Sequence, residues 1–280
     1  MRKGKFILIL GVILLGIIAY FINHNISRTV DINGEILLNY CYDENDCIVI
    51  YSCEKKEYTE LPLKGSQAAF GSNNTVFVKD MNIYKYDIDA DEMSVVYASE
   101  DLIDYFAVVG EDKLSIARDS LIFLYDINSK NEIVLAEDNG SDVHSFSDDG
   151  ELLFYSNNDG MVKSVNVYTG ESTEICKGWD PIVSGSNVVC RSKDGLFVKN
   201  METGKIYEYK RAVYDYCFSP DGSCVLVETQ LSFFENGLKL LLKGRNLYVR
   251  TLCSWNFEHE SEEIVIEGLS HHPNRIFDWR

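Results

Sequence analysis

Four aspartates recur in this chain at the spacing of one repeat, and three of them stand beside an aromatic residue. The four local pairs read Asp104-Tyr105, Asp142-Val143, Trp179-Asp180 and Tyr214-Asp215. If the fold brings them together, the carboxylates would bind a cation, a sugar or a basic peptide, and the aromatic rings would offer stacking surfaces. The alternative is structural, because such aspartates also cap strand starts in solvated loops. The choice depends on the elements that carry them.

No other residue set marks a reaction. The 44 acidic residues make some glycosidase-like carboxylate pair inevitable by chance, so no pair is selected. The five histidines have no metal-ligand spacing, and the adjacent His271 and His272 are typical of a surface loop. We expect no catalytic residue, no metal and no cofactor.

The eight cysteines permit disulfides but include no CxxC pair, which leaves a zinc site or a thioredoxin-type redox centre without support. Cys41 and Cys47 flank a polar turn and would bridge a hairpin. Others lie inside strand-like runs, such as Cys190 in VVCRS, where cysteine often packs as a small hydrophobe. We expect at most one or two bridges.

The elements that position the aspartates are short strands in a repeat. Helical periodicity nearly vanishes after Asn33, and strand-like runs are separated by Gly, Asn and Asp. FSDDG at 146–150 recurs as FSPDG at 218–222, two periods of 36 residues later, with the degenerate VSGSN at 183–187 halfway between.

A second recurring position, where a strand ends in a polar turn, gives the phase of each repeat. Its members are Ser52, Asp87, Asp126, Asn166, Asn200 and Thr251. The intervals are 35, 39, 40, 34 and 51 residues, and the last contains an insertion. Four antiparallel strands in about 35 to 45 residues form the blade of a β-propeller, in which stacked blades bury faces that one small sheet would expose.

The sequence therefore predicts an all-β fold, a β-propeller of about six four-stranded blades, preceded by one N-terminal transmembrane helix. The expected blades lie near 30–64, 65–100, 101–139, 140–178, 179–211 and 212–258. The strand-like C-terminal segment would close the ring by joining the first or the last blade, which removes open sheet edges.

The hairpin at 218–222 resembles the FSPDG hairpin of TolB-like and WD40-like propellers and of the propeller part of prolyl-oligopeptidase-family proteins. Gly150 and Gly222 would supply the positive φ of a tight turn, and the preceding aspartate would cap it. The resemblance covers about 250 residues as a pattern and implies the fold more than a family. The Gly-His dipeptide of true WD40 repeats is absent, and the Trp-Asp dipeptide at 179–180 is out of phase with the repeat. The sequence also contains no sialidase Asp-box and no G-x-S-x-G elbow.

Propellers place ligands at the mouth of the central channel, and we expect the recurring aspartates at the rim where the innermost strands begin. The candidate ligand-binding residues are Asp104, Tyr105, Asp142, Trp179, Asp180, Tyr214 and Asp215. A one-residue slip in this alignment would turn the side chains to the opposite face.

The N-terminal residues predict a membrane anchor. Residues 6–22 contain no charge, and a helix of this length just crosses a thin hydrocarbon core. Arg2, Lys3 and Lys5 precede it, which favours a cytoplasmic N-terminus. We expect a cytoplasmic tail at 1–5, a signal-anchor helix at 6–22 and an extracytoplasmic propeller at 23–280. The alternative is a cleaved signal peptide.

The predicted exterior part is strongly acidic. After residue 22 the chain has 44 acidic and 23 basic residues, a net charge of −21. Such a surface repels nucleic acid and anionic headgroups, so we expect no nucleic-acid partner. It favours basic proteins or cations, although plain solubility explains it as well.

An insertion in the last repeat, at 229–246, carries a strong hairpin turn at Asn236-Gly237. Its candidate partner-binding residues are Phe233, Phe234, Leu240, Leu241 and Leu242. This apolar hairpin would either meet a partner, a subunit or the membrane, or fold back and seal the base of the propeller.

Together these features predict a membrane-anchored, non-catalytic scaffold that binds a protein, peptide or glycan. The alternative function is a glycan-active hydrolase or lyase that uses acidic residues at the propeller rim.

Overall fold

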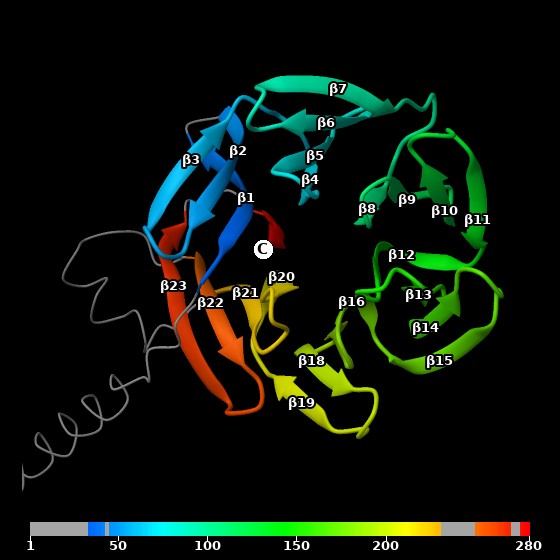
Figure 1. The fold of residues 1–280 in the computed structure, drawn as a ribbon. Coiled ribbons are helices and arrows are strands. Elements are labelled where there is room, and N and C mark those ends of the chain that lie inside the picture. Colours follow the sequence, from blue (N-terminus) through cyan, green and yellow to red (C-terminus); the bar gives the residue numbers. More distant parts are fainter. Residues whose placement is uncertain (1–32, 43–44, 231–249, 270–274) are drawn as a thin grey trace, which may run out of the picture.

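The structure, a computed structural model, describes residues 33–42, 45–230, 250–269 and 275–280. Within these ranges the chain is all-β: 24 strands form six four-stranded antiparallel sheets, blades I to VI, around a central axis (Figure 1). The predicted six-bladed propeller is confirmed. Each blade runs outward from the axis in chain order, except that the C-terminal strand forms the centre of blade I.

The strands of the first three blades, from the axis outward, are as follows. Blade I has β24 (Arg275–Trp279), β1 (Glu35–Tyr42), β2 (Asn45–Ser52) and β3 (Glu57–Leu61). Blade II has β4 (Gln67–Phe70), β5 (Thr75–Lys79), β6 (Ile83–Asp87) and β7 (Glu92–Tyr97). Blade III has β8 (Tyr105–Val109), β9 (Lys113–Arg118), β10 (Leu121–Asp126) and β11 (Glu132–Ala136).

The other three blades follow the same order. Blade IV has β12 (Asn139–Phe146), β13 (Leu152–Asn157), β14 (Met161–Asn166) and β15 (Ser172–Lys177). Blade V has β16 (Trp179–Ser184), β17 (Asn187–Ser192), β18 (Gly195–Asn200) and β19 (Ile206–Tyr209). Blade VI has β20 (Val213–Phe218), β21 (Val225–Gln230), β22 (Arg250–Asn256) and β23 (Ser261–Leu269).

The last residues of the chain close the ring. β24 pairs antiparallel with β1, so strands from both ends of the chain share blade I, as one of the two predicted closures requires. The Arg280 guanidinium lies 2.8 Å from the Glu35 carboxylate and donates to Asn74 Oδ1 of blade II at 2.9 Å. Trp279 Nε1 donates to the Asn33 carbonyl at 3.0 Å.

The core of the protein is divided among the blade interfaces. Each of the six contacts between neighbouring blades contains one cluster of buried apolar side chains. The interface between blades IV and V has the smallest cluster, with Val162, Val188 and Cys190 as its fully buried members. Because a lone blade would expose these faces, the burial that stabilises each sheet comes from both of its neighbours.

The FSPDG hairpin owes its shape to one serine and one aspartate. Ser219 Oγ donates to the Asp221 carboxylate at 2.6 Å and accepts the Cys224 N–H at 3.0 Å. Gly222 takes the predicted positive φ, 68°. The turn at 147–150 repeats this network with the same residue types, so the predicted capping role of both aspartates is confirmed.

The polar turns whose recurrence set the phase of the repeats are also stabilised in the same way. The side-chain oxygen of the phase residue accepts a backbone N–H in its own turn, as Asp126 does from Ser129 at 2.7 Å. Asn256 has this role in blade VI, accepting the His259 N–H at 3.0 Å. The phase assigned to Thr251 is therefore wrong by five residues, since Thr251 lies within β22. The insertion before it hid the true period.

The backbone register does not favour the predicted bridge between Cys41 and Cys47. Cys47 lies directly opposite Tyr40, and the partner of Cys41 is Asp46. Residues directly opposite one another are the ones that a cross-strand bridge joins. The side chain of Cys41 lies outside the described part of the chain.

The predicted anchor at 6–22 lies outside the described residues, and so does the apolar hairpin with Phe233, Phe234, Leu240, Leu241 and Leu242. Among the residues that are described, no helix is long and apolar enough to cross a membrane.

Candidate functional site

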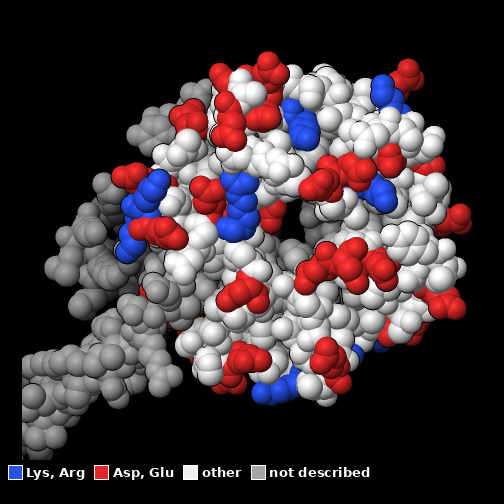
Figure 2. Space-filling model, viewed as in Figure 1, with Lys and Arg blue, Asp and Glu red and all other residues white. Residues whose placement is uncertain are grey.

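A cavity of about 620 Å³ occupies the axis of the ring. Its size is within the range of about 300–1,000 Å³ that is usual for ligand sites. The innermost strand of every blade contributes to its wall, and many of the lining side chains are apolar, including Phe70, Val108 and Phe218. Figure 2 shows a hollow at the centre of the ring with acidic residues around its rim.

Polar side chains of β8 and β12 also line the cavity. The ring of Tyr105 meets the edge of the His144 ring with 5.1 Å between centroids. His144 is buried, and its Nε2 lies 2.5 Å from Ser115 Oγ. Burial raises the pKa of Tyr105, and the nearby carboxylates of Asp215 and Asp278 raise it further. Tyr105 therefore stays a neutral phenol in a negative field at physiological pH.

Polar side chains in the wall also join one blade to the next. Asp278 of β24 accepts the Phe70 N–H of β4 at 2.9 Å, and its other carboxylate oxygen accepts the Trp279 N–H at 2.9 Å. Burial raises the pKa of Asp278 despite these two hydrogen bonds, which oppose the shift. Gln67 joins blades II and III in the same way, because its amide bonds both the carbonyl (2.7 Å) and the N–H (3.1 Å) of Phe106.

One mouth of the cavity, where the innermost strands end, is acidic. Its charged and aromatic lining residues are Asp112, Lys113, Asp148, Asp149 and Tyr168. The hydrogen bond from Ser147 holds the pKa of Asp149 below its ordinary value, so this carboxylate is ionised at neutral pH. The Tyr168 side chain is 73% exposed and offers an aromatic surface to a ligand at this mouth. Charge and aromatic surface together suit a cationic or hydroxyl-rich ligand.

The rim residues predicted from the sequence lie toward the opposite end, where the innermost strands begin. Tyr105 lines the cavity, whereas the lining does not include the other predicted residues whose side chains are described. These are Asp104, Trp179, Asp180, Tyr214 and Asp215. Asp142 belongs to β12, but its side chain lies outside the described part of the structure.

Several of these predicted residues make contacts between blades. Arg191 pairs with Asp180 at 3.1 Å and donates to the carbonyls of Val213 (2.7 Å) and Tyr214 (3.2 Å). It thereby joins blades V and VI, which agrees with a structural role for Asp180. The Trp179 ring packs against Gly160 of blade IV, where an added Cβ would lie 2.6 Å from the ring. Ligand binding by this set stays a prediction.

Sequence reasoning missed the acidic mouth. Asp148 and Asp149 belong to the FSDDG motif, which indicates the fold and the alignment of the repeats but did not by itself suggest a ligand site. The position of the motif was a usable signal. FSDDG joins the first and second strands of its blade, and such a turn lies at the end of the channel where the innermost strand ends. Asp278 carried no such signal, since the C-terminal strand has no repeat motif.

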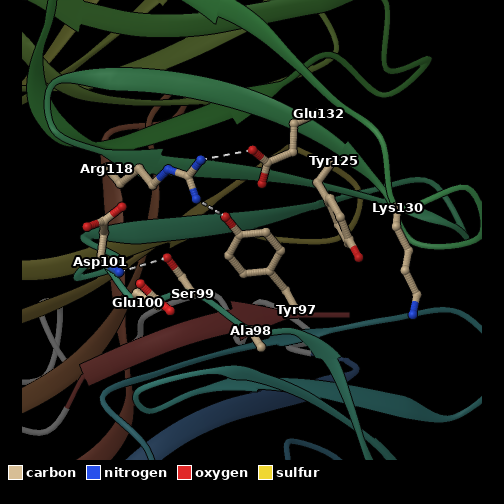
Figure 3. Close-up of a pocket in the computed structure, with 9 residues that line it drawn as sticks. All are labelled: Tyr97, Ala98, Ser99, Glu100, Asp101, Arg118, Tyr125, Lys130 and Glu132. Carbon is tan, nitrogen blue, oxygen red and sulfur yellow. Dashed lines mark hydrogen bonds and ion pairs between the residues drawn. The ribbon is translucent and has the colours of Figure 1, made fainter.

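A second pocket, of about 450 Å³, lies between blades II and III. Figure 3 shows the Arg118 guanidinium between Tyr97 and Glu132, with the carboxylate 2.8 Å away and the tyrosine hydroxyl as its second partner. The rings of Tyr97 and Tyr125 meet edge-on with 4.9 Å between centroids. Because Arg118 is already engaged inside the protein, this pocket is better described as a seam between blades than as an anion site.

The acidic residues of the chain raise the question of a metal centre. Across the described ranges, no three His, Cys, Asp or Glu side chains are placed to hold a metal ion.

The comparisons with known proteins agree with this architecture. No protein-family model matches the chain, and no curated protein matches it. TolB from Acinetobacter baumannii is similar in structure, with a TM-score of 0.66 and 13% identity over 89% of this chain and 67% of that one. An oligogalacturonate lyase in complex with manganese is similar with a TM-score of 0.53 and 16% identity over 84% of this chain and 74% of that one. At such identities the likeness shows a shared fold, with TolB as a structural neighbour.

Proposed function

We propose that this protein is a non-catalytic binding scaffold whose propeller captures a basic peptide or protein segment at the acidic mouth of its channel. The membrane anchor at 6–22 and the extracytoplasmic position of the propeller belong to the same proposal. They rest on the uncharged N-terminal run and the basic residues before it.

The acidic mouth is the observation that carries the proposal. Asp112, Asp148 and Asp149 lie at the opening, against Lys113 as the basic residue in the lining. Apolar side chains such as Phe70, Val108 and Phe218 also line the cavity, so a segment with a lysine or arginine next to an apolar residue would satisfy both parts of the site. The net charge of −18 for the whole chain would steer such a partner toward the protein.

The carboxylates near the cavity support binding more than catalysis. Asp180 is paired with Arg191, and Asp278 accepts two backbone N–H groups. Asp149 is engaged by Ser147 and has a lowered pKa, which suits a fixed charge and not a general acid.

A glycan-active enzyme is the second candidate, and the fold shared with an oligogalacturonate lyase is the observation that favours it. That lyase was solved with manganese, for which the described residues of this chain offer no cluster of three suitable ligands. Oligogalacturonate is also a polyanion, and an acidic mouth would repel it. These two points place the enzyme second.

The proposal is tested by calorimetric titration of the purified protein with a short oligolysine peptide, with oligoglutamate as the comparison. We expect oligolysine to bind and its affinity to fall about tenfold, or about 1.4 kcal/mol, when Asp112 and Asp148 are both changed to Asn. The matched control changes Asp119 and Asp194, exposed residues in turns at the other end of the ring, and should leave the affinity unchanged.

Two results would reject the proposal. Equal binding of oligolysine and oligoglutamate would show that mouth charge does not select the ligand. Release of unsaturated or reducing ends from polygalacturonate or a neutral glycan by the wild-type protein, lost in the double mouth variant, would establish the enzyme instead.

A further inference from the structure

Two cysteines from neighbouring blades lie in direct contact. Cys176 is near the end of β15 in blade IV, and Cys190 lies within β17 of blade V. Their Sγ atoms are 3.9 Å apart, and one thiol donates a hydrogen bond to the other. A disulfide bond is about 2.05 Å long, so the sulfurs would have to approach by about 1.9 Å, which is within reach of side-chain rotation.

The chain between the two cysteines passes close to the second one. A Cβ built on Gly178 would lie 2.9 Å from the Cβ of Cys190. Only glycine therefore lets the backbone after β15 run so near to β17. This close approach holds the segment with Cys176 against Cys190, so the contact between the thiols is built into the backbone.

The two thiols differ in access. Cys190 is fully buried in the core between blades IV and V, whereas Cys176 is partly exposed at the edge of that core. A reagent from solvent therefore reaches Cys176 first. Cys190 can react only with a group that is already attached to Cys176.

The contact with Cys190 and the nearby charge of Lys199 make Cys176 the more acidic thiol. The Lys199 ammonium donates to the Ile175 carbonyl at 2.6 Å, which fixes a positive charge beside the next residue. The hydrogen bond with Cys190 lowers the pKa of Cys176, and the Lys199 charge lowers it further. The pKa of Cys190 is raised by its hydrogen bond with Cys176 and by burial. Thiolate character, on which exchange reactions depend, thus resides on the accessible sulfur.

We propose that Cys176 and Cys190 form a reversible disulfide that cross-links blades IV and V. The oxidant is a small disulfide such as oxidised glutathione. The Cys176 thiolate attacks one sulfur of that disulfide, whose S–S bond breaks, and the other half leaves as a thiolate. Cys190 then loses its proton and attacks Cys176 Sγ, and the second half leaves as a thiolate that takes up this proton. The protein gives up two electrons, and the oxidant becomes two thiols.

The cross-link would join the two blades that share the smallest buried apolar cluster. The closed loop, residues 176–190, contains the whole of β16, the strand of blade V that lines the channel. Oxidation would therefore hold one wall of the channel in place by a covalent bond, whether or not the channel binds the partner proposed above.

Trypsin offers a direct test, because it cuts after Lys163, Lys177 and Arg191. The two cysteines then fall on separate peptides, 164–177 and 178–191. After the reduced protein is incubated with oxidised glutathione and the remaining thiols are alkylated, we expect these peptides to be joined in one species. Its mass should be that of both peptides less two hydrogen atoms. Dithiothreitol should separate them.

Matched variants distinguish this pair from general oxidation. Cys176→Ser should abolish the joined species, and Cys190→Ala should leave glutathione attached to Cys176. Cys224→Ala, a change at a buried cysteine of blade VI, should leave the joined species intact. In the wild type, oxidation should also raise the denaturant midpoint of unfolding, and Cys176→Ser should remove this rise.

The proposal is overturned if both peptides carry only alkylated cysteines after the incubation, or if Cys176 of the wild type stays in the mixed disulfide. Because the deciding measurement uses the wild-type protein, it does not depend on the folding of any variant.

Discussion

Replacing Ser219 with alanine tests the physical basis of the FSPDG hairpin. Ser219 Oγ has two roles at once, since it donates to the Asp221 carboxylate at 2.6 Å and accepts the Cys224 N–H at 3.0 Å. Ser219 and Cys224 are both buried, whereas Asp221 is exposed. The substitution removes both hydrogen bonds and leaves the backbone of the turn in place.

The larger loss comes from the Cys224 N–H. A buried donor without an acceptor costs about 1–3 kcal/mol. The hydrogen bond to Asp221 adds less than about 1 kcal/mol, because water replaces it at an exposed carboxylate. We expect a total of about 2–3 kcal/mol. With a urea slope of about 3 kcal/mol per molar, the unfolding midpoint should fall by roughly 0.7–1 M.

The matching change at Ser147 provides an internal scale. Ser147 makes the same contacts in blade IV, but it is only half-buried, so water can reach the freed Leu152 N–H. Ser147→Ala should therefore cost about 1 kcal/mol. The difference between the free energies of unfolding of the two variants measures how much burial adds to the cost of leaving the turn N–H without an acceptor.

The pH dependence gives a second readout. Hydrogen bonds from Ser219 and then from Ser223 lower the pKa of Asp221 in the folded state. A lowered folded pKa contributes stability above the unfolded pKa of about 4, and this contribution is lost as pH falls through the folded pKa. The stability difference between the wild type and Ser219→Ala should therefore narrow below about pH 4.

Urea unfolding followed by tryptophan fluorescence measures the midpoint, and NMR titration of the Asp221 carboxylate measures its pKa. In Ser219→Ala that pKa should rise toward the ordinary aspartate value. The reasoning is refuted if Ser219→Ala unfolds at the same urea concentration as Ser147→Ala, or if the Asp221 pKa does not move.

Two further predictions concern the turns and the wall of the channel. Gly222→Ala should destabilise the protein by about 1 kcal/mol more than Gly170→Ala. Both glycines have a positive φ, but only a Cβ at position 222 would lie 2.6 Å from Ser184 Oγ. Equal urea midpoints of the two variants would contradict this. Asp278→Asn keeps an acceptor for the Phe70 N–H, loses the acceptor of the Trp279 N–H and removes a charge whose pKa burial raises. Its thermal stability relative to the wild type should therefore be most favourable at pH 7 and should decline as pH falls through that pKa, because protonation relieves the wild type of the charge. Asp278→Ala should instead cost about 1–3 kcal/mol, and a neutral effect of alanine would disprove the contact between blades I and II.

Most of the fold could be predicted because the blades repeat the same turns, which are stabilised by the same short-range hydrogen bonds. The serine and aspartate of FSDDG and FSPDG and the phase residues such as Asp126 and Asn200 are short-range signals that survive in the sequence. The error at Thr251 arose where an insertion separates two paired strands, so counting residues no longer measures position in the blade. Closure of the ring by the C-terminal strand, β24, could be predicted because it removes an open sheet edge, although no motif marks this strand.

The candidate site was less predictable because it depends on contacts between blades. A periodic alignment can place Asp180 and Asp215 near one rim, but it cannot show that Arg191 engages Asp180 from the neighbouring strand. It likewise cannot bring Cys176 next to Cys190, since that contact depends on how blade IV packs against blade V. The acidic mouth contains the aspartates of the FSDDG motif. Because a structural role in the turn already explained these aspartates, their exposure to the channel could not be inferred from the motif.

In the proposed function, partners bind where the innermost strands end. Hydrogen exchange of the purified protein, measured with and without saturating oligolysine, locates the binding site. We predict slower exchange at the turns 110–112 and 147–150, and unchanged exchange around Asp104 and Asp215 at the other end of the channel. Protection confined to Asp104 and Asp215, or protection at neither end, would contradict the claim.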